Sequence, residues 1–408
     1  MQPSGEDQPP EQLPPIALPA GVTEDYVDCQ DSCGLTWHVL KAGDAGKRPL
    51  VLFCHGFPEL AYSWRRVLPR VAEAGSGYFC VAMDQRGYGR TTTTMTGGGW
   101  PRRQPPFHEV ELGDYVFTNL VRDLVCLVYG LGYTEVFSII GHDFGGVSSA
   151  MAALMRPDMF RSTVQMSHPH RPVPTPRLGK GEPAKPKPRP KPDIQAELAK
   201  LDPPRKHYKW YNSTPEAAAD WDDPPQGLEA FLRGYFHLKS ADWAGNDPRP
   251  LREWSAETLA VMPEYYIMRK DDSMPEVVRR NMAGEDEAAT ETWLSRDELR
   301  VYCAEWRRTG FQGALNWYRA QTATTQQSAR DVLLYAGRRI EVPCAYVGGR
   351  LDWGTFQQPG ALESYDTAES VEPGCFRGAT LIEGAGHWVQ QEKPEAVVKA
   401  ILAFFASL

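Results

Sequence analysis

An aspartate stands at the centre of the glycine-rich segment 141–146, which reads GHDFGG. A strand-like apolar run over 136–140 precedes it, and small residues typical of a helix follow from 146 to 155. A nucleophile between a strand and a helix, with glycines two positions before and after it, is the pattern of a nucleophile elbow. A carboxylate there can displace at a saturated carbon and form an alkyl-enzyme ester. The pattern predicts that Asp143 is a nucleophile; a turn in which Asp143 only caps a helix is the alternative.

A histidine between small residues is the candidate general base. His387 lies in 384–388 (GAGHW), after the last strand-like run and before the final helix. Imidazole titrates near neutral pH, so this side chain can take a proton from water. Such a base needs a carboxylate that fixes its tautomer. Asp352, just past the strand-like run 342–347, is better placed for that task than Asp366 or Glu383.

The segment 55–59, HGFPE, offers a backbone donor. It directly follows the strand-like run 49–54, and loops at the carboxyl ends of strands hold the sites of open α/β sheets. In enzymes with an elbow, this loop gives one backbone N–H to the oxyanion hole and the residue after the nucleophile gives the second. By position the two donors are Phe57 and Phe144. A tight turn at the glycine and proline, without catalytic function, is the alternative.

The elements that position these residues alternate along the chain. A hairpin is expected over 23–29 and 35–42, followed by strands at 49–54, 78–83, 136–140 and 161–167 and by helices at 62–74 and 114–130. Sheet signals return at 342–348 and 379–383, and a helix over 393–405 closes the chain. Continuous apolar strands between helices predict an α/β fold with a mostly parallel sheet covered on both faces.

The alternation stops in the middle of the chain. Residues 171–193 are rich in proline and lysine and predict an extended surface insertion, with a ligand for an SH3-type domain or an acidic partner as the alternative. Residues 194–333 read as helical and aromatic, which predicts an inserted helical cap. The expected organisation is a Pro-rich extension (1–20), a core (21–168 and 334–408), a linker (169–193) and the cap (194–333).

Composition excludes several classes of protein. The net charge of −8 and the pI near 5.7 argue against a nucleic-acid or anionic-membrane binder. The sequence contains no run of eighteen or more apolar residues, so no transmembrane helix is expected. The polar N-terminus lacks the regions of a secretory signal. The eight scattered cysteines predict reduced core thiols in a cytoplasmic protein, and no ligand spacing predicts a metal.

The ordered set of motifs resembles the α/β-hydrolase-fold epoxide hydrolases of the soluble fungal and bacterial type. The resemblance covers residues 21–408, and its motifs are HGFPE at 55–59, YSWR at 62–65, DQRGYGRT at 84–91, GHDFGG at 141–146, HYKWY at 207–211, LNWYRA at 315–320, GGRLD at 348–352 and GAGHW at 384–388. Two features depart from the family pattern. The Pro/Lys-rich insertion is longer than expected, and Phe144 stands where many relatives carry tryptophan.

The resemblance implies that two cap tyrosines hold the epoxide oxygen. They fall on Tyr208 and Tyr318, while Tyr211 and Tyr235 remain open as alternatives to Tyr208. Ring opening develops an alkoxide, which a phenol can hydrogen-bond and then protonate. Tryptophans near the motifs are expected to line an apolar substrate pocket, with plain core packing as the alternative: Trp64, Trp210, Trp317 and Trp388.

The predicted function is hydrolysis of an epoxide to a vicinal diol without a cofactor. The expected partners are a small apolar epoxide and water, with no nucleic acid or membrane, and the expected state is a monomer or homodimer. A dehalogenase is the first alternative, but the usual halide donors are absent where Phe57 and Phe144 stand. A non-catalytic ligand-binding protein on the same fold is the second alternative.

Overall fold

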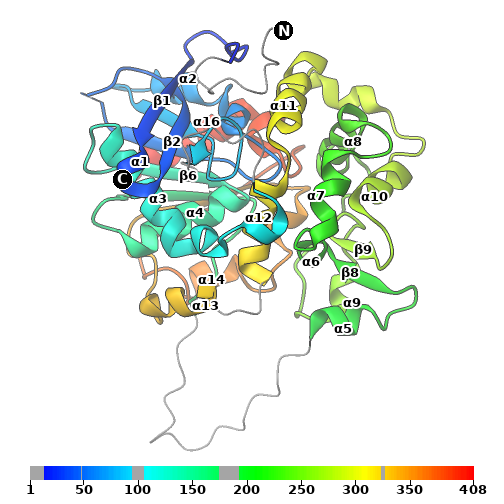
Figure 1. Cartoon of the computed structure of the whole chain (residues 1–408). Helices are drawn as coiled ribbons and strands as arrows, with labels where there is room; N and C mark the ends of the chain where they lie inside the picture. The colour runs from blue at the N-terminus through cyan, green and yellow to red at the C-terminus, as the bar shows by residue number, and fades with distance from the viewer. Residues whose placement is uncertain (1–12, 47, 94–104, 174–192, 323–326) are drawn as a thin grey trace, which may run out of the picture.

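The computed structural model describes residues 13–46, 48–93, 105–173, 193–322 and 327–408. In Figure 1 the α/β core lies on the left and a helical cap lies against it on the right. Most of the predicted Pro/Lys-rich insertion (174–192) and the first twelve residues lie outside the described residues. The described part of the N-terminal extension contacts the core, because Ile16 N–H donates to Glu24 (3.1 Å) and Pro14 C=O accepts from Arg90 (3.0 Å).

The core is built on one sheet of nine strands among the described residues, in the order β1-β2-β4-β3-β6-β7-β10-β11, with β5 paired to β2. The expected N-terminal hairpin is confirmed as antiparallel β1 and β2, β2 also runs antiparallel to β4 and β5, and the other pairings are parallel. The strands are β1 (Thr23–Cys29), β2 (Leu35–Ala42), β3 (Leu50–Cys54), β4 (Phe79–Met83), β5 (Thr92–Thr93), β6 (Ser138–His142), β7 (Thr163–Met166), β10 (Cys344–Gly349) and β11 (Phe376–Ile382).

The parallel strands end together at one edge of the sheet. Cys54 of β3 pairs with Gly141 of β6, and His142 pairs with Met166 of β7. On the other side of β7, Val347 of β10 pairs with Met166. The loops that follow these strands therefore meet at the carboxyl edge, where sites of parallel sheets lie.

Helices cover both faces of the sheet. One buried cluster packs α3 (Phe117–Gly130) and α4 (Phe144–Met155) on one face, and another packs α2 (Leu68–Ala72) and α16 (Pro394–Phe405) on the other. The remaining core helices are short: α1 (Gln30–Cys33), α14 (Glu363–Asp366), α15 (Val389–Glu392), and the 3₁₀ turns η3 (Ala61–Trp64), η4 (Phe107–Glu109), η5 (Leu112–Tyr115), η7 (Leu333–Tyr335) and η8 (Trp353–Thr355).

Two expected core helices differ from the structure. The single helix predicted over 62–74 is instead η3 followed by α2, because Pro69 lacks an N–H and its ring excludes it from a helix interior. The helix predicted over 114–130 begins at Phe117, because Val116 has extended backbone angles (φ −76°, ψ 152°). The strand before the elbow is also two residues later than predicted, so that α4 starts immediately after Asp143.

The cap lies between β7 and β10 in the sequence. Its helices are α5 (Ile194–Leu198), α6 (Tyr208–Tyr211), α7 (Pro215–Asp222), α8 (Leu228–Lys239), α9 (Ala256–Leu259), α10 (Met274–Asn281), η6 (Glu287–Thr292), α11 (Arg296–Thr309) and α12 (Gln312–Thr322). α13 (Gln327–Val332) also precedes β10 but packs against α3 of the core. It also holds an antiparallel pair, β8 (Arg205–His207) and β9 (Ile267–Arg269). Strands of three residues are too short to show the period-2 pattern, so the sequence did not predict them.

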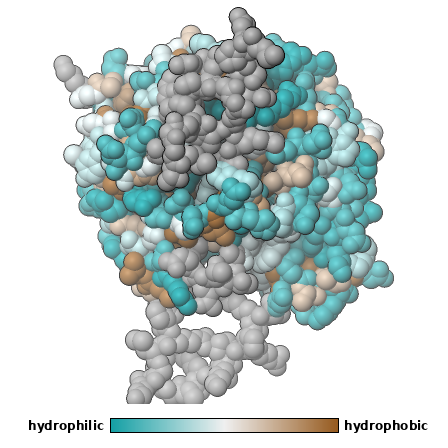
Figure 2. Space-filling model, in the orientation of Figure 1, coloured by the Kyte–Doolittle hydropathy of each residue, from teal (hydrophilic) through white to brown (hydrophobic). Residues whose placement is uncertain are grey.

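The surface on the face of Figure 2 is mostly hydrophilic, with small and separated hydrophobic patches. Large hydrophobic residues exposed in the described part of the chain are few: Tyr129, Val261, Leu333, Leu334 and Leu408. Among the described helices, none combines the length and the apolar character needed to cross a bilayer. The hydrophobic residues are instead concentrated in the two sheet faces and in the aromatic contact between core and cap.

Candidate active site

Asp143 occupies a strained turn between β6 and α4. Its φ of 53° and ψ of −113° lie in a region that residues other than glycine seldom adopt. The glycines around it are required by close contact: a Cβ at Gly141 would lie 1.8 Å from Gly145 O, and a Cβ at Gly145 would lie 2.1 Å from Cys54 O. The elbow predicted from the sequence is thus present, and it holds the carboxylate at the edge of the sheet.

The loop after β3 approaches this carboxylate with its backbone. Phe57 N–H donates a hydrogen bond to Asp143 Oδ1 (3.1 Å). A Cβ on Gly56 would lie 2.4 Å from Asp143 Cβ, so only glycine permits this approach. Phe144 is the first residue of α4, where a backbone N–H has no partner within the helix. The two predicted oxyanion donors therefore flank the carboxylate.

His387 faces Asp143 from the loop after β11. Its Nδ1 lies 3.0 Å from Asp352 Oδ1, which also accepts the N–H of Gly354 at 2.6 Å. A carboxylate only accepts, so Nδ1 carries the proton and Nε2 presents a lone pair. Nε2 lies 3.9 Å from Asp143 Oδ2, beyond hydrogen-bond distance, and has no hydrogen-bond partner among the described residues. The structure thus brings the three predicted residues of a triad together.

The charges of the site favour an ionised Asp143 and a neutral His387. Burial, the largest effect, would raise the pKa of Asp143, but the electrostatic effects of His387 and then of Lys239 outweigh it and lower the pKa to about 2. Burial and then the Lys239 ammonium lower the pKa of His387, against the opposing effect of Asp352. A charged nucleophile beside a neutral base is the protonation state that ester formation and hydrolysis require.

Lys239, at the end of α8, was not identified from the sequence. Its ammonium lies within 6 Å of the centroids of four rings: 5.2 Å from Tyr235, 5.9 Å from Tyr265, 5.0 Å from Tyr266 and 5.2 Å from Trp388. The side chain is buried, and burial lowers its pKa to about 8 while Asp143, Asp352 and Glu59 oppose that shift. Aromatic faces stabilise the cation without neutralising it, so its field reaches the catalytic groups.

The loop that carries the base is bonded to the cap. His387 N–H donates to Lys239 C=O (2.8 Å), and Trp388 Nε1–H donates to Phe236 C=O (2.8 Å). The partly buried carboxylate of Glu392 joins both sides, since it accepts the N–H groups of Ala241 (2.9 Å), Gly386 (2.8 Å) and Trp388 (2.9 Å). The position of His387 therefore depends on α8 as well as on the core.

A buried pair formed by Glu59 and His142 supports the loop that carries His387. Glu59 Oε2 accepts from His142 Nδ1 (2.6 Å), while Glu59 Oε1 accepts from Gln390 (2.8 Å) and Gln391 (2.9 Å). The other ring nitrogen of His142 donates to the carbonyl of His387 (2.7 Å). Glu59 and His142 belong to the sequence motifs at 55–59 and 141–146, but no role was predicted for either residue.

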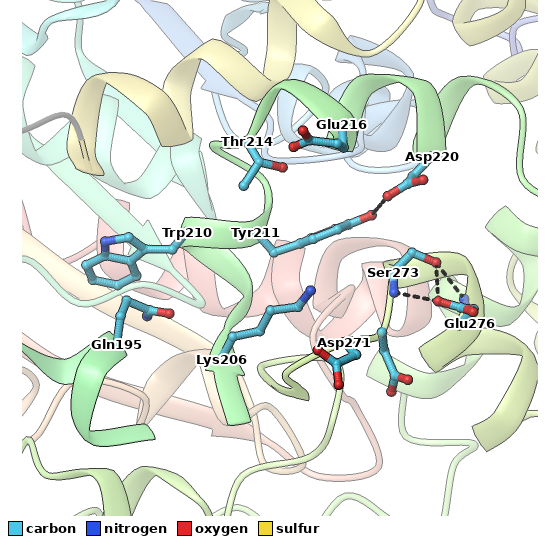
Figure 3. A pocket seen from close by; sticks show the side chains of 11 residues that line it. Gln195, Lys206, Trp210, Tyr211, Thr214, Glu216, Asp220, Asp271, Ser273 and Glu276 are labelled. Carbon is cyan, nitrogen blue, oxygen red and sulfur yellow. Dashed lines mark hydrogen bonds between the residues drawn. The ribbon is translucent and has the colours of Figure 1, made fainter. Parts of the chain in front are cut away.

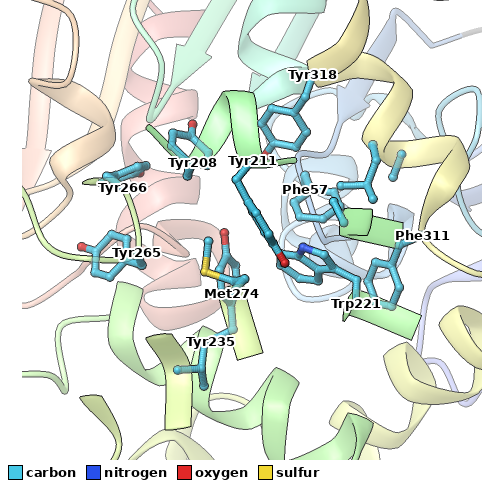
Figure 4. Packing of buried hydrophobic residues seen from close by; sticks show 14 of the residues in the cluster. Phe57, Tyr208, Tyr211, Trp221, Tyr235, Tyr265, Tyr266, Met274, Phe311 and Tyr318 are labelled. Carbon is cyan, nitrogen blue, oxygen red and sulfur yellow. The ribbon is translucent and has the colours of Figure 1, made fainter. Parts of the chain in front are cut away.

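The two predicted cap tyrosines lie together over the loop after β3. The rings of Tyr208 and Tyr318 are 5.7 Å apart at their centroids and T-shaped, and Tyr318 also contacts Phe57 (5.4 Å) and Phe144 (4.7 Å). Figure 4 shows Tyr208, Tyr318 and Phe57 in one aromatic cluster. Burial, and then the charge of Asp143, raises the pKa of Tyr208, so its hydroxyl keeps its proton.

The alternative tyrosines differ in their hydrogen bonding. Tyr211 O–H donates to Asp220 (2.7 Å) within the cap, as Figure 3 also shows, whereas Tyr208 O–H reaches only Gln357 at 3.5 Å. Tyr235 is buried, its ring packs 5.1 Å from that of Trp221, and its pKa is raised by burial and by Asp143. The geometry favours Tyr208 over Tyr211, and Tyr235 also lies within the electrostatic reach of the nucleophile.

The four predicted pocket tryptophans separate into two groups. Trp317 packs on Phe144 (5.3 Å) and Trp388 on His387 (4.5 Å), so both adjoin the site. Trp64 instead packs on Phe53 in the cluster between the sheet and α16, because η3 directs it inward. Trp210 lines a hollow of about 350 Å³ on the cap, shown in Figure 3, whose lining includes Tyr211 but neither the triad nor Tyr208 and Tyr318. The expectation that Trp64 and Trp210 line the substrate pocket has no support from these positions.

No group of three or more His, Cys, Asp or Glu side chains within the described ranges is arranged to hold a metal ion. The described catalytic candidates are instead a carboxylate, an imidazole paired with a second carboxylate, backbone donors and phenols. This set can perform nucleophilic displacement followed by general-base hydrolysis.

Comparisons with known proteins agree with this geometry. A family model described as alpha/beta hydrolase fold matches residues 49–221. The chain is 31% identical over 382 residues to epoxide hydrolase A of Mycobacterium tuberculosis, covering 93% of this chain and 96% of that protein. It is 27% identical over 375 residues to an epoxide hydrolase of Caballeronia sordidicola, covering 92% of each.

Solved structures are similar over almost the whole chain. An epoxide hydrolase from an endophytic Streptomyces superposes with a TM-score of 0.70 at 26% identity, over 95% of this chain and 96% of that one. Potato epoxide hydrolase I superposes with a TM-score of 0.65 at 26% identity, over 95% and 100%. The similarity thus includes both the sheet and the inserted helical cap.

Proposed function

The chain belongs to the epoxide hydrolases of the α/β-hydrolase fold, and we propose that it opens epoxides to vicinal diols through a covalent ester on Asp143. The observation that carries this proposal is the arrangement around one carboxylate. Oδ1 is held by Phe57 N–H at 3.1 Å, and Oδ2 faces His387 Nε2 at 3.9 Å. The first oxygen is thereby oriented, and the second is left to attack.

In the first step, Asp143 Oδ2 attacks one ring carbon of the epoxide. The new C–O ester bond forms as the carbon–oxygen bond of the ring breaks, and the electron pair of that bond goes to the epoxide oxygen. Tyr208 and Tyr318 hydrogen-bond this oxygen and supply the proton that turns it into a hydroxyl. The low pKa of Asp143 keeps the nucleophile ionised, and the raised pKa values of both tyrosines keep their hydroxyls protonated and able to donate a hydrogen bond.

In the second step, His387 Nε2 takes a proton from a water molecule, which attacks the ester carbon of Asp143. The backbone N–H groups of Phe57 and Phe144 stabilise the oxyanion, and Asp352 stabilises the imidazolium that forms. Collapse of the tetrahedral intermediate breaks the bond between the ester carbon and the substrate oxygen. The diol leaves with the proton from His387. The second proton of the water passes from the new carboxyl group of Asp143 to the phenolate of the cap tyrosine, which restores both residues.

A single turnover in water enriched in heavy oxygen tests the scheme, with enzyme in excess over a neutral epoxide such as styrene oxide. The diol of that turnover takes its new oxygen from Asp143, so we expect label in the peptide that contains Asp143 and none in the diol. Repeated turnovers then carry label into the diol. Labelled diol in the first turnover, with an unlabelled Asp143 peptide, would show direct attack by water and overturn the ester.

We further propose that the enzyme works in the cytoplasm on small apolar epoxides, as a monomer or homodimer, with residues 194–333 as one cap domain. The acidic net charge and the eight free thiols support the location. The aromatic cluster between core and cap supports an apolar substrate. Light scattering of the purified chain and fractionation of the source cells test the assembly and the location, and limited proteolysis tests the domain boundaries.

A further inference from the structure

A buried glutamine joins the segment that carries the triad acid to a cap tyrosine. Gln357 lies shortly after Asp352, and its backbone N–H donates to the C=O of Trp353 (2.8 Å), which holds this end of the segment. Its side chain is 1% exposed, and its Oε1 lies 3.5 Å from Tyr208 Oη. At the start of the same segment, Asp352 accepts from His387 Nδ1 at 3.0 Å. Residues 352–357 therefore connect the triad directly to Tyr208.

The side-chain amide of Gln357 has an unused donor. Its Nε2 has no hydrogen-bond partner among the described residues, although buried polar atoms are rarely left without one. The contact with Tyr208 is long for a hydrogen bond between two oxygens, so Gln357 does not hold the proton of the phenol tightly. Rotation of the amide by half a turn exchanges its oxygen and nitrogen and directs an N–H at Tyr208 Oη. The same side chain can thus accept from a phenol and donate to a phenolate.

Tyr208 needs such a donor if it gives up its proton. Burial, and then the electrostatic effects of Asp143, Tyr235 and Asp352, raise its pKa, and each of these effects opposes a phenolate. Among the described residues, Gln357 is the one hydrogen-bond partner of Tyr208 Oη. A hydrogen bond from an amide N–H to a phenolate is charge-assisted and therefore stronger than one between neutral groups. Gln357 is thus the residue placed to stabilise this phenolate.

Tyr318 has no equivalent support. Its ring lies 5.7 Å from that of Tyr208 in the cluster of Figure 4, and no hydrogen bond joins its hydroxyl to a described residue. After burial, Asp143 is the largest effect that raises the pKa of Tyr208. For Tyr318, Asp143 follows the effects of two tyrosines. Because the ester neutralises Asp143, ester formation removes more of the opposition to a phenolate at Tyr208 than at Tyr318.

We propose that Tyr208 alone gives its proton to the opened epoxide, and that Gln357 is the positioning residue that stabilises the Tyr208 phenolate. The inference rests on the proposed function and divides the roles of its two tyrosines. As the ring bond breaks, its electron pair goes to the epoxide oxygen, and the proton of Tyr208 Oη moves to that oxygen. The negative charge passes from Asp143 to Tyr208, where an N–H of Gln357 binds it. Tyr318 hydrogen-bonds the same oxygen and retains its proton.

The rate of alkylation by styrene oxide in a single turnover measures the contribution of Gln357. Gln357→Met removes the amide but keeps a side chain of similar length. We expect the maximal alkylation rate to fall about 10- to 100-fold, the range of a hydrogen bond to a charged group. The substrate concentration at half-saturation is expected to stay unchanged, because the phenolate exists only after the proton has moved. A wild-type rate in this variant overturns the inference.

The neighbouring glutamine provides the matched control. Gln358→Met removes a buried amide that accepts from Arg171 (2.9 Å) and has no hydrogen bond to Tyr208, so it is expected to keep the wild-type alkylation rate. Circular dichroism and melting temperature verify that each variant is folded. If Gln357→Met does not fold, Gln357→Leu takes its place with the same expected result. An equal loss of rate in the Gln357 and Gln358 variants overturns the inference.

Double variants test whether Gln357 acts through Tyr208. In Tyr208→Phe no phenolate forms, so adding Gln357→Met is expected to leave the alkylation rate nearly unchanged, whereas in Tyr318→Phe it keeps its full effect. A structural role would slow both backgrounds equally, which overturns the inference. Loss of the effect in Tyr318→Phe alone assigns the proton to Tyr318 and also overturns it, while epoxide hydrolysis stands. A wild-type enzyme that forms neither ester nor diol contradicts the proposed function itself.

Discussion

Glu59 Oε2 and His142 Nδ1 lie 2.6 Å apart with both side chains fully buried. The second nitrogen of the same ring donates to His387 C=O at 2.7 Å. A carboxylate and a carbonyl both accept, so His142 carries a proton on each nitrogen and forms a buried ion pair with Glu59. This pair lies between the loop after β3 and the loop that carries the base, and it holds both at the edge of the sheet.

Removal of one charge from this pair is expected to destabilise the fold strongly. Glu59→Gln leaves the His142 cation buried without its partner, which costs about 3–5 kcal/mol. Unfolding in urea, followed by circular dichroism, measures the loss. Glu395→Gln removes a carboxylate from an exposed pair with Arg70 and is expected to cost at most about 1 kcal/mol. Equal midpoints for the two variants would contradict the assignment.

The stability of the pair depends on pH from both sides. Burial opposes both charges, yet His142 lowers the pKa of Glu59 and Glu59 raises the pKa of His142. The contribution of Glu59 is present above its unfolded pKa and is lost as pH falls through its lowered folded pKa. The contribution of His142 is complete below its unfolded pKa and is lost as pH rises through its raised folded pKa. The pair is therefore strongest in mildly acidic solution, and the difference in stability between wild type and Glu59→Gln is expected to be largest there.

The cap tyrosines are expected to control the first step. Tyr208→Phe and Tyr318→Phe each remove an acid that stabilises the leaving oxygen, and we expect the alkylation rate to fall about 10²- to 10⁴-fold. Stopped-flow quenching of tryptophan fluorescence during a single turnover measures this rate. Tyr211→Phe is the control, because its hydroxyl is bonded to Asp220. If Tyr235→Phe slows alkylation and Tyr208→Phe does not, Tyr235 is the second acid.

Loss of the base is expected to separate the two chemical steps. His387→Gln retains Asp143 and the tyrosines, so the ester forms, but water is no longer activated and the ester accumulates. Mass spectrometry of the intact protein after mixing with styrene oxide should show a gain equal to one substrate. Asp143→Asn cannot form the ester and serves as the negative control. An unmodified His387→Gln protein that slowly releases diol would assign a different role to this histidine.

The charge of Lys239 is expected to set the pH below which ester hydrolysis slows, which is the acid limb of the pH–rate profile. The ammonium interacts electrostatically with Asp143, Asp352 and Glu59, and after burial it is the largest effect that lowers the pKa of His387. Lys239→Met therefore raises that pKa, and hydrolysis, which needs the neutral base, starts to fail at a higher pH. Single-turnover rates of ester decay between pH 5 and pH 9 locate the limb.

Two further variants distinguish charge from packing at this position. Lys239→Arg keeps the charge and is expected to keep the limb near its wild-type position. Lys206→Met removes a cap cation that lies over Tyr211 (4.9 Å) and leaves the limb unchanged. A limb that stays in place in Lys239→Met would show that the lysine serves packing alone.

The sequence predicted those parts of the site that depend on strand ends. Asp143, Asp352 and His387 each follow a parallel strand, so the fold alone brings them to one edge. The pair of Glu59 and His142 depends on contacts between residues 83 positions apart and has no local signature. The four rings around Lys239 come from α8, from residues 265–266 and from the loop that carries His387. Only the docked cap brings these rings together.

Errors in the prediction have local physical causes. The strand before the elbow lies two residues later than predicted. Gly141 and His142 pair with β7 as part of β6, but a small residue and a polar residue do not extend an apolar run in the sequence. Trp64 was assigned to the pocket from its nearness to a motif, but the 3₁₀ turn directs it toward Phe53. Side-chain direction in a short turn is not encoded by residue spacing, so sequence patterns cannot assign it.

The hydrogen bonds that join Lys239 to His387 and Ala241 to Glu392 limit how the cap can be exchanged. Because His387 and Glu392 are tied to the end of α8, the cap is not an interchangeable module on an independent catalytic core. A chimera that replaces residues 194–333 as a block exchanges the support of the general base together with the pocket. Recombination that preserves residues 236–241 with the core, and varies the cap beyond them, is the route by which new pockets can arise without loss of the base.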